Sequence, residues 1–382
     1  MLIDSYKRTI DYLRVSVTDR CNFRCVYCMP EEGAPVSPKE EILTYEEMER
    51  LVRIAVSLGM TKIRLTGGEP LVRKDIATLV ERIGAIPGLR DLSMTTNGFL
   101  LERYAADFAR HGLNRINISL DTLRPERFVR IARRGNLDDV LAGIEAAQEA
   151  GLSPIKLNCV VMRGWNEDEV VDFARLTLEQ PFNVRFIELM PINWSKGDDS
   201  GSGSLSDFFA LAAAPGYRPD SNIRLYAREE LRSFRETFRV KDTNLQRGQL
   251  DAAQMRQAFV STAEMRARIE AALGPMEPAE VVTNGPARSF RLSRARGTIG
   301  FISQITNDVC VNCNRLRLTA DGQLRPCLMA DGEVDLRSLL RSGASDDEIA
   351  ERFRLTVRHK PKEHRLEDGV APVGRNMSQL GG

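Results

Sequence analysis

The sequence predicts an α/β protein built around a partial (βα)6 barrel, with an α+β region after it. The prediction rests on the alternation of strand-like and helix-like segments and on the number of such units, which is six. Between Leu13 and Met190, apolar β-rich runs alternate with longer segments of helical spacing. Strands that alternate with helices form right-handed βαβ units and a parallel sheet. Six such units form most of a barrel without closing an eight-stranded one.

The expected elements follow in chain order. Six buried strands are expected at 13–18, 62–66, 92–96, 115–120, 155–162 and 184–190, and helices at 44–59, 73–84, 102–112, 137–151, 167–179 and, later in the chain, 261–274. Beyond Pro191 the alternation breaks. The expected division is a barrel over 1–195, an inserted surface segment over 196–258 that contains GDDSGSGS, an α+β region over 259–360 and a tail over 361–382.

Length and charge limit the possible functions. The chain has 382 residues, 42% of them hydrophobic, which suits one large domain with an appendage. A net charge of +1 gives no general attraction to nucleic acid or to an anionic membrane. No apolar run approaches the roughly 18 residues of a membrane span, and the opening Met1-Leu2-Ile3-Asp4 begins no signal peptide. We therefore expect a cytoplasmic protein.

Unusual residues follow the predicted strands. In a barrel or an open sheet, functional residues collect beyond the carboxyl ends of parallel strands. There the sequence places a cysteine-rich loop, Thr66-Gly67-Gly68-Glu69-Pro70, Thr95-Thr96-Asn97-Gly98 and Ser119-Leu120-Asp121, while Lys156 lies within the fifth strand and Met190 ends the sixth. One rim of the sheet should receive all of them.

The first cysteine group has the spacing C-x3-C-x2-C at Cys21, Cys25 and Cys28. Clustered thiolates in a reducing compartment are typical of metal or cluster ligands, because they need a cation to offset their repulsion. Three sulfur ligands leave one iron of a 4Fe-4S cluster open. The alternative is a zinc site whose fourth ligand comes from elsewhere, although none of the three histidines lies nearby in sequence. Cys159, alone in a strand, is expected to be a small buried apolar residue.

This cysteine loop, with Tyr27 in it and Gly67-Gly68-Glu69-Pro70 after the next strand, resembles the signature of radical S-adenosylmethionine enzymes. The resemblance implies that the cofactor chelates the open iron and is cleaved to a 5′-deoxyadenosyl radical. For Gly67 and Gly68 we expect close approach of the cofactor, because glycine has no Cβ.

A second cysteine group consists of Cys310, Cys313 and Cys327. Between its members lies Arg315-Leu316-Arg317-Leu318, in which a strand would direct both arginines to one face. Two guanidiniums beside a cluster favour binding of anionic oxygen, most naturally phosphate. For an isolated segment of this kind, a solvated strand face would be the better interpretation.

The chain resembles the GTP 3′,8-cyclase family, which opens molybdenum cofactor biosynthesis, in the segments LRVSVTDRCNFRCVYCMP, TGGEPLVR, TTNG, INISLD, RFIELMP and CVNCNRLRLTADGQLRPCL and in the terminal Gly381-Gly382. The resemblance implies two 4Fe-4S clusters, held by Cys21, Cys25 and Cys28 and by Cys310, Cys313 and Cys327. It assigns S-adenosylmethionine to Tyr27, Gly68, Ser119 and Met190. It assigns GTP to Arg14, Arg64, Thr95, Lys156, Arg315, Leu316 and Arg317, with Lys62 as a secondary candidate. The residues implied as catalytic are the first three cysteines, Arg14, Arg315 and Arg317. Basic residues from several strands offset the triphosphate's charge of about four without a net basic surface.

The family's reaction begins with hydrogen abstraction from ribose C3′, and the C3′ radical then attacks guanine C8. The resemblance also implies a separate cyclic pyranopterin monophosphate synthase that takes the product, an electron donor such as flavodoxin or ferredoxin, and a monomeric or homodimeric state. It implies that the Gly-Gly tail enters the site. The segment 196–258 departs from the family pattern, and a neutral surface loop is expected there.

Two other functions remain open from the residues. One is a radical S-adenosylmethionine peptide maturase with an auxiliary cluster, against which Arg315 and Arg317 argue. The other is a non-catalytic zinc protein that binds nucleic acid or a partner. Metal content separates the two classes, because the enzyme should carry about eight irons per chain and little zinc.

Overall fold

The computed structural model describes residues 1–190, 250, 252–281, 285–306, 309–330, 332–364, 375 and 377–380. Most of the expected inserted segment, up to residue 249, and the terminal Gly381-Gly382 lie outside the described residues. A two-stranded sheet of β1 (Leu2–Ile3) and β2 (Thr9–Ile10) opens the chain. All other described strands join one sheet.

The large sheet has twelve described strands in the order β14-β13-β12-β3-β4-β5-β6-β7-β8-β11-β10-β9. The strands from β12 to β11 in this order are parallel, and an antiparallel pair flanks them at each end. The bounds are β3 (Tyr12–Ser16), β4 (Lys62–Thr66), β5 (Asp91–Thr96), β6 (Arg115–Ser119), β7 (Ile155–Val161), β8 (Asn183–Glu188), β9 (Met276–Pro278), β10 (Arg288–Leu292), β11 (Thr298–Ile302), β12 (Arg315–Leu318), β13 (Gln323–Arg325) and β14 (Val334–Asp335).

The prediction of an α/β partial barrel is confirmed, and β3 to β8 are the six expected strands. The difference concerns the C-terminal strands. β12 pairs in parallel with β3, and β11 pairs in parallel with β8, so the C-terminal region extends the barrel sheet at both edges. An edge strand leaves backbone donors and acceptors unpaired, and these two strands satisfy them.

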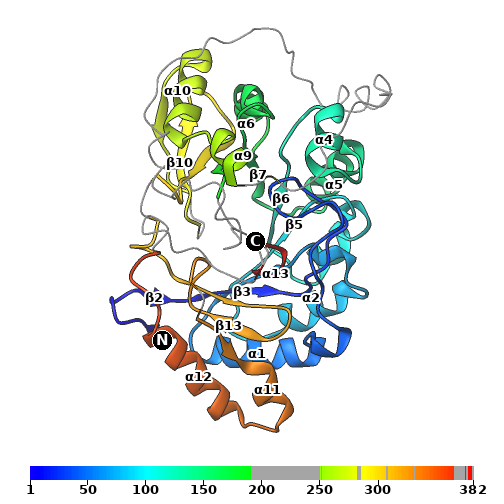
Figure 1. Ribbon diagram of the computed structural model, residues 1–382, viewed down its shortest axis with the longest axis vertical. Coiled ribbons are helices and arrows are strands. Elements are labelled where there is room, and N and C mark those ends of the chain that lie inside the picture. The colour runs from blue at the N-terminus through cyan, green and yellow to red at the C-terminus, as the bar shows by residue number, and fades with distance from the viewer. Residues whose placement is uncertain are drawn as a thin grey trace.

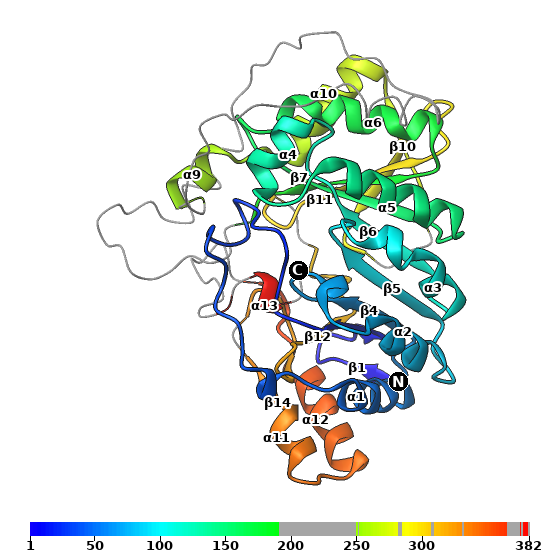
Figure 2. The same ribbon diagram turned by 90° about the vertical axis from the view of Figure 1, so that its right-hand side faces the viewer.

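Helices cover the outer face of the sheet, one after another along the side seen in Figure 2. The described helices are α1 (Tyr45–Ser57), α2 (Ile76–Gly84), α3 (Ala105–Arg110), α4 (Pro125–Ala132), α5 (Leu137–Glu149), α6 (Val170–Glu179), α9 (Ala252–Gln257), α10 (Thr262–Leu273), α11 (Leu336–Arg341), α12 (Asp346–Arg358) and α13 (Met377–Leu380). Four short 3-10 turns are described as well: η1 (Lys39–Glu41), η2 (Pro70–Val72), η3 (Leu101–Arg103) and η4 (Glu167–Glu169).

Local sequence explains where these helices begin. Thr44 caps α1 through a capping box with Glu47, and Ser345 caps α12 in the same way with Glu348. Pro125 occupies the first turn of α4, where its missing N–H costs nothing. The periodic segments correctly predicted α1, α2, α3, α5, α6 and α10, whereas α4, α11 and α12 were not expected.

The fold brings distant parts of the chain to the inner face of the sheet. The short helix α13, near the C-terminal end, lies close to β3 in Figure 1, and its Met377 and Ser378 line one cavity with Arg14 of β3. The main apolar core lies between the sheet and its outer helices, and a second, smaller apolar cluster joins Val26, Leu328 and Leu380. Among the described helices, none has the length and apolar character that crossing a membrane requires.

Candidate functional site

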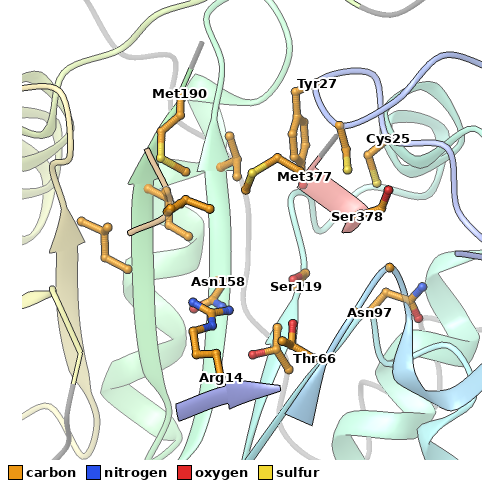
Figure 3. A pocket seen from close by; sticks show the side chains of 18 of the residues that line it. Arg14, Cys25, Tyr27, Thr66, Asn97, Ser119, Asn158, Met190, Met377 and Ser378 are labelled. Atoms are coloured by element: carbon orange, nitrogen blue, oxygen red, sulfur yellow. The ribbon is translucent and has the colours of Figure 1, made fainter. Parts of the chain in front are cut away.

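One cavity on the inner side of the sheet collects most of the expected site residues. Its walls contain the first cysteine group, the glycines of the second loop and several arginines, contributed by β3 to β8, β12 and the C-terminal helix. Figure 3 shows Arg14 and Asn158 at one end, and Cys25 and Tyr27 at the other, beside Met377 and Ser378. A ligand in this cavity would contact segments from both ends of the chain.

The loop of the first cysteine group is held at its middle by the end of α4. Arg24 N–H donates to Ala132 O at 2.9 Å, and Val26 N–H donates to Ile131 O at 3.0 Å, so the end of α4 pairs with the loop. Phe23 is buried between the rings of Phe99 and Phe128, at centroid distances of 5.7 Å and 5.5 Å. The loop thus presents Cys21, Cys25 and Cys28 to the cavity.

The chemistry of these thiols fits a metal cluster. Burial, with nearby carboxylates such as Glu69 and Asp121, raises the pKa of Cys21 and of Cys28 to about 12. Burial also raises the pKa of Cys25 well above its usual value. Three such thiolates cannot coexist without a bound cation. Among the described residues, no three His, Cys, Asp or Glu side chains are close enough together to hold a metal ion as they stand.

Gly67 and Gly68 line the cavity, but the structure gives a different reason for glycine. A Cβ on Gly68 would lie 2.3 Å from Arg20 O, and one on Gly67 would lie 2.5 Å from Thr18 O. The backbone leading into the cysteine loop therefore requires glycine at both positions, and the expected approach of the cofactor stays a prediction. Gly68 N–H donates to Thr18 O at 2.8 Å, which locks the two loops together.

Glu69 fixes the neighbouring loop from within. Its buried carboxylate accepts hydrogen bonds from Thr96 Oγ1 at 2.6 Å, Asn97 N–H at 2.6 Å and Leu71 N–H at 3.0 Å. Burial raises the pKa of Glu69 to about 7, although these hydrogen bonds oppose the shift. Glu69 lines the cavity, although the sequence alone predicted no role for it apart from the Gly-Gly-Glu-Pro segment.

Tyr27, Ser119 and Met190 all line the same cavity as the first cysteine group. The Tyr27 hydroxyl donates to Asp121 Oδ2 at 2.8 Å, and Val160 N–H donates to Asp121 Oδ1 at 2.9 Å. Burial raises the pKa of Asp121 to about 6. This buried carboxylate orients the tyrosine beside Cys25 and Cys28.

Arginines on adjacent strands form a row across the sheet. Arg317 on β12 is in register with Arg14 on β3, and Arg14 is in register with Arg64 on β4. Neighbouring residues of parallel strands in register point to the same face, and here that face is the cavity wall. Arg315 also lines the cavity. Strand β12 alternates as expected, because Leu316 and Leu318 are buried in the core.

Arg185 on β8 is an arginine of the cavity that the sequence analysis missed. Its guanidinium donates to Asn117 Oδ1 at 2.8 Å, and Gly300 on the neighbouring strand leaves room for its stem. Burial, with the charges of Arg64 and Arg115, lowers the pKa of Arg185 to about 9. In the sequence, only its place in the expected strand 184–190, on one of the two alternating faces, could have indicated that Arg185 points toward the site.

The wall is rich in buried cations, and burial lowers the pKa of several of them. Burial and the charge of Arg315 lower the pKa of Arg317 to about 10, and burial with Arg317 lowers the pKa of Arg14 well below its usual value. Arg14 Nε, Arg64 Nη2 and Arg185 Nε have no hydrogen-bond acceptor within the described residues. Such a wall favours a polyanionic ligand.

The remaining expected GTP residues differ in their positions. Thr95 lines the cavity. Lys156 is 1% exposed behind it, its Nζ has no acceptor in the described part, and burial with three nearby arginines lowers its pKa to about 5. Lys62 begins β4 and is paired with Asp11 at 2.6 Å. The side chain of Leu316 lies in the core, so only its backbone could contact a ligand.

The second cysteine group lies beside the arginine wall. Burial of Cys313 opposes ionisation, but Arg315 and Lys360 overcome it and lower the pKa of this thiol to about 6. Cys327 packs against the same apolar cluster as Tyr27, and its neighbour Leu328 lines the cavity. The described lining of the cavity includes the neighbours Arg315 and Leu328 but none of Cys310, Cys313 and Cys327. Cys159 is buried and, among the described residues, no disulfide forms at any of the seven cysteines.

The C-terminal helix α13 enters the cavity. Met377 and Ser378 line it, Ser378 N–H forms a hydrogen bond with the Cys28 thiol, and Arg317 donates to Leu380 O at 3.2 Å. Arg375 anchors the tail through ion pairs with Asp321 at 2.9 Å and Glu333 at 2.6 Å. The expectation for Gly381-Gly382 concerns residues outside the described part, but the residues before them reach the site.

Comparison with known proteins identifies two matching regions. Residues 15–177 match the Radical SAM superfamily, and residues 245–366 match the family described as Molybdenum Cofactor Synthesis C. The matches leave residues 178–244 between them. The solved structure of Streptococcus suis SuiB bound to S-adenosylmethionine is 13% identical and covers 91% of this chain and 66% of that one, with a TM-score of 0.45.

Curated relatives match along the whole chain. The GTP 3′,8-cyclase of Moorella thermoacetica is 45% identical over 380 residues and covers 99% of both chains. That of Heliobacterium modesticaldum is 46% identical and covers 100% of both, and that of Thermodesulfovibrio yellowstonii is 42% identical over 99% of both. With this identity over its full length, the chain belongs to the GTP 3′,8-cyclase family of the radical S-adenosylmethionine superfamily.

Proposed function

We propose that this chain catalyses the reaction for which its relatives are named, the 3′,8-cyclisation of GTP, as an early step of molybdenum cofactor biosynthesis. One observation carries the proposal: a group of three cysteines and a wall of buried arginines face the same cavity. The first suits an iron-sulfur cluster with an open iron, and the second suits a triphosphate. No other described cavity combines them.

In this proposal, Cys21, Cys25 and Cys28 hold one 4Fe-4S cluster, and Cys310, Cys313 and Cys327 hold a second. With S-adenosylmethionine bound beside it, the first cluster would supply the radical chemistry that starts the reaction. The protein's task is to position the substrate and to keep water away from it. The raised thiol pKa values of the first group support its assignment, since only a bound cation makes all three thiolates stable.

The triphosphate would lie against the arginine wall. Arg14, Arg64 and Arg317 are adjacent in the sheet and direct three guanidiniums to one strip of the cavity. Arg315 extends this strip toward the second cysteine group, and Arg185 faces it from β8. Buried guanidiniums form strong, often bidentate hydrogen bonds to phosphate oxygens. Thr95 and Lys156 would complete the phosphate site.

The S-adenosylmethionine site would lie at the other end of the cavity. Tyr27, Gly68, Ser119 and Met190 surround the first cysteine group there. Figure 3 shows Tyr27 and Met190 at the end of the cavity away from Arg14, with Ser119 between this end and Arg14. The guanine and ribose would then bind between the two clusters, with C3′ directed toward the first.

We further propose which proteins act with this chain and where it acts. A separate cyclic pyranopterin monophosphate synthase would consume the product, and a low-potential carrier such as flavodoxin or ferredoxin would supply electrons. The protein would act in the cytoplasm, as a monomer or a homodimer. A peptide maturase is not favoured, because a peptide would leave the buried arginine wall without anions.

The direct test uses anaerobically reconstituted and reduced protein. It is incubated with GTP and S-adenosylmethionine, and the products are identified by mass. The expected products are 5′-deoxyadenosine and an isomer of GTP in equal amounts, because the hydrogen atom that GTP gives to deoxyadenosine is replaced by one electron from the reductant and one proton. The isomer has the mass of GTP and is separated from it by chromatography. Zinc in place of iron after anaerobic purification, or deoxyadenosine release that GTP does not affect, would contradict the proposal.

A further inference from the structure

Lys360 is a buried lysine with no acidic partner among the described residues. It follows α12, and only 3% of it is exposed. Its ammonium donates to two main-chain carbonyls, Arg315 O at 2.9 Å and Pro326 O at 2.6 Å. Burial of a positive charge is costly unless an anion compensates it. The position of Lys360 therefore points to a negatively charged group nearby.

The two carbonyls belong to separate arms of the second cysteine group. Arg315 lies two residues after Cys313, and Pro326 directly precedes Cys327. A single ammonium thus joins the two arms through the backbone.

The third arm is attached to the same short segment by another cation. Arg8 donates to Cys310 O at 2.8 Å, and also to Pro361 O at 2.6 Å and Lys362 O at 2.7 Å. Asp4, which is fully buried, holds the Arg8 guanidinium at 2.6 Å. Residues 360–362 are therefore the common anchor of all three cysteine arms.

We infer that Lys360 is a positioning residue for the second iron-sulfur cluster. Its ammonium holds the Cys313 and Cys327 arms at one spacing and compensates the negative charge of a cluster bound by three thiolates. This inference rests on the proposed ligation by Cys310, Cys313 and Cys327. Lys360 itself contacts neither the substrate nor, through any described hydrogen bond, a sulfur atom.

The test compares Lys360→Met with Lys362→Met. The Lys362 side chain is exposed, and only its main-chain carbonyl joins the anchor, so this variant controls for loss of a nearby lysine. Both proteins and the wild type are reconstituted anaerobically and desalted. Iron and sulfide per chain and the electron paramagnetic resonance spectra of the reduced proteins, with and without GTP, are then measured.

We expect about eight irons per chain in the wild type and in Lys362→Met, and about four in Lys360→Met. The signal that responds to GTP should be absent from Lys360→Met, while the first cluster still cleaves S-adenosylmethionine. Lys360→Arg, which keeps the charge and the donors, should retain more of the second cluster than Lys360→Met. Circular dichroism and melting of the cluster-free proteins check that the variants fold.

Three results would overturn the inference. Lys360→Met could hold as much iron as the wild type, with both spectra unchanged. It could lose both clusters equally and melt well below the wild type, which would show a general role in folding. Lys360→Arg could lose the cluster as fully as Lys360→Met. A wild-type protein with about four irons would instead refute ligation by the second cysteine group.

Discussion

The burial of Lys156 predicts that this lysine takes up a proton when GTP binds. Burial and three neighbouring arginines lower its pKa from 10.5 to about 5, so less than about 1% of this lysine is protonated at pH 8 in the ligand-free protein. A bound triphosphate would bring several negative charges close to the amine and raise its pKa. Binding of GTP should therefore take up about one proton at Lys156.

The sign of the pH dependence follows from this uptake. Because the proton is bound in the complex and absent from the free protein, higher pH weakens binding. Between about pH 6 and the pKa of the complex, the dissociation constant should rise about tenfold per pH unit. The terminal phosphate of GTP has a pKa of about 6, so at pH 8 it contributes little to proton exchange.

The assay is calorimetric titration of the oxidised protein with GTP at pH 8, without S-adenosylmethionine. It is performed in two buffers of different ionisation enthalpy, and the slope of observed against buffer enthalpy gives the protons taken up. The slope should be about one for the wild type and near zero for Lys156→Met. Equal slopes for the two proteins would refute the reasoning.

The same substitution should stabilise the ligand-free protein. Keeping Lys156 unprotonated at pH 8 costs at most about 3 kcal/mol, since its folded pKa lies far below its unfolded value. Stability therefore rises with pH between about 5 and 10.5 in the wild type, and Lys156→Met should lose this dependence. Thermal melts across this range would measure it.

Three further substitutions test other parts of the site. Cys21→Ala should abolish deoxyadenosine formation because the first cluster loses a ligand, while iron analysis still finds about four irons from the second cluster. Arg317→Ala should raise the dissociation constant of GTP about 30-fold or more and leave the first cluster intact, and unchanged affinity in calorimetry would contradict the phosphate assignment. Gly68→Ala should lower the melting temperature and the occupancy of the first cluster, since its Cβ would meet Arg20 O at 2.3 Å. If Gly68→Ala bound the first cluster as fully as the wild type, the close packing of the Gly67-Gly68 loop on the cysteine loop would not be required for cluster binding.

Local patterns predicted the barrel strands and the cysteine groups well. The alternation of strands and helices identified β3 to β8, because a buried parallel strand is a continuous apolar run. Cysteine spacing and the two arginines of β12 correctly placed chemistry near one cavity. The helix α4 was missed because it has only eight residues and begins at a proline, which usually marks a loop.

Long-range pairing could not be predicted from these patterns. The sequence of Arg315–Leu318 shows that it alternates, but not that it pairs with β3, about 300 residues earlier. Arg185 was missed because a single arginine in an apolar strand carries no motif. The close approach of Gly68 to Arg20 was not foreseen, because it involves a loop about 50 residues earlier in the chain. In each case a partner distant in sequence decides the outcome.

The pairing of β12 with β3 bears on how the protein matures in the cell. A chain emerging from the ribosome completes the strands β3 to β8 long before Arg315 is made, and until then the backbone edge of β3 is open. The nascent protein thus exposes the thiols of the first cysteine group before strand β12 is available to complete the sheet. Metal loading that waits for release of the full chain would protect both the open edge and the sulfur atoms from wrong partners.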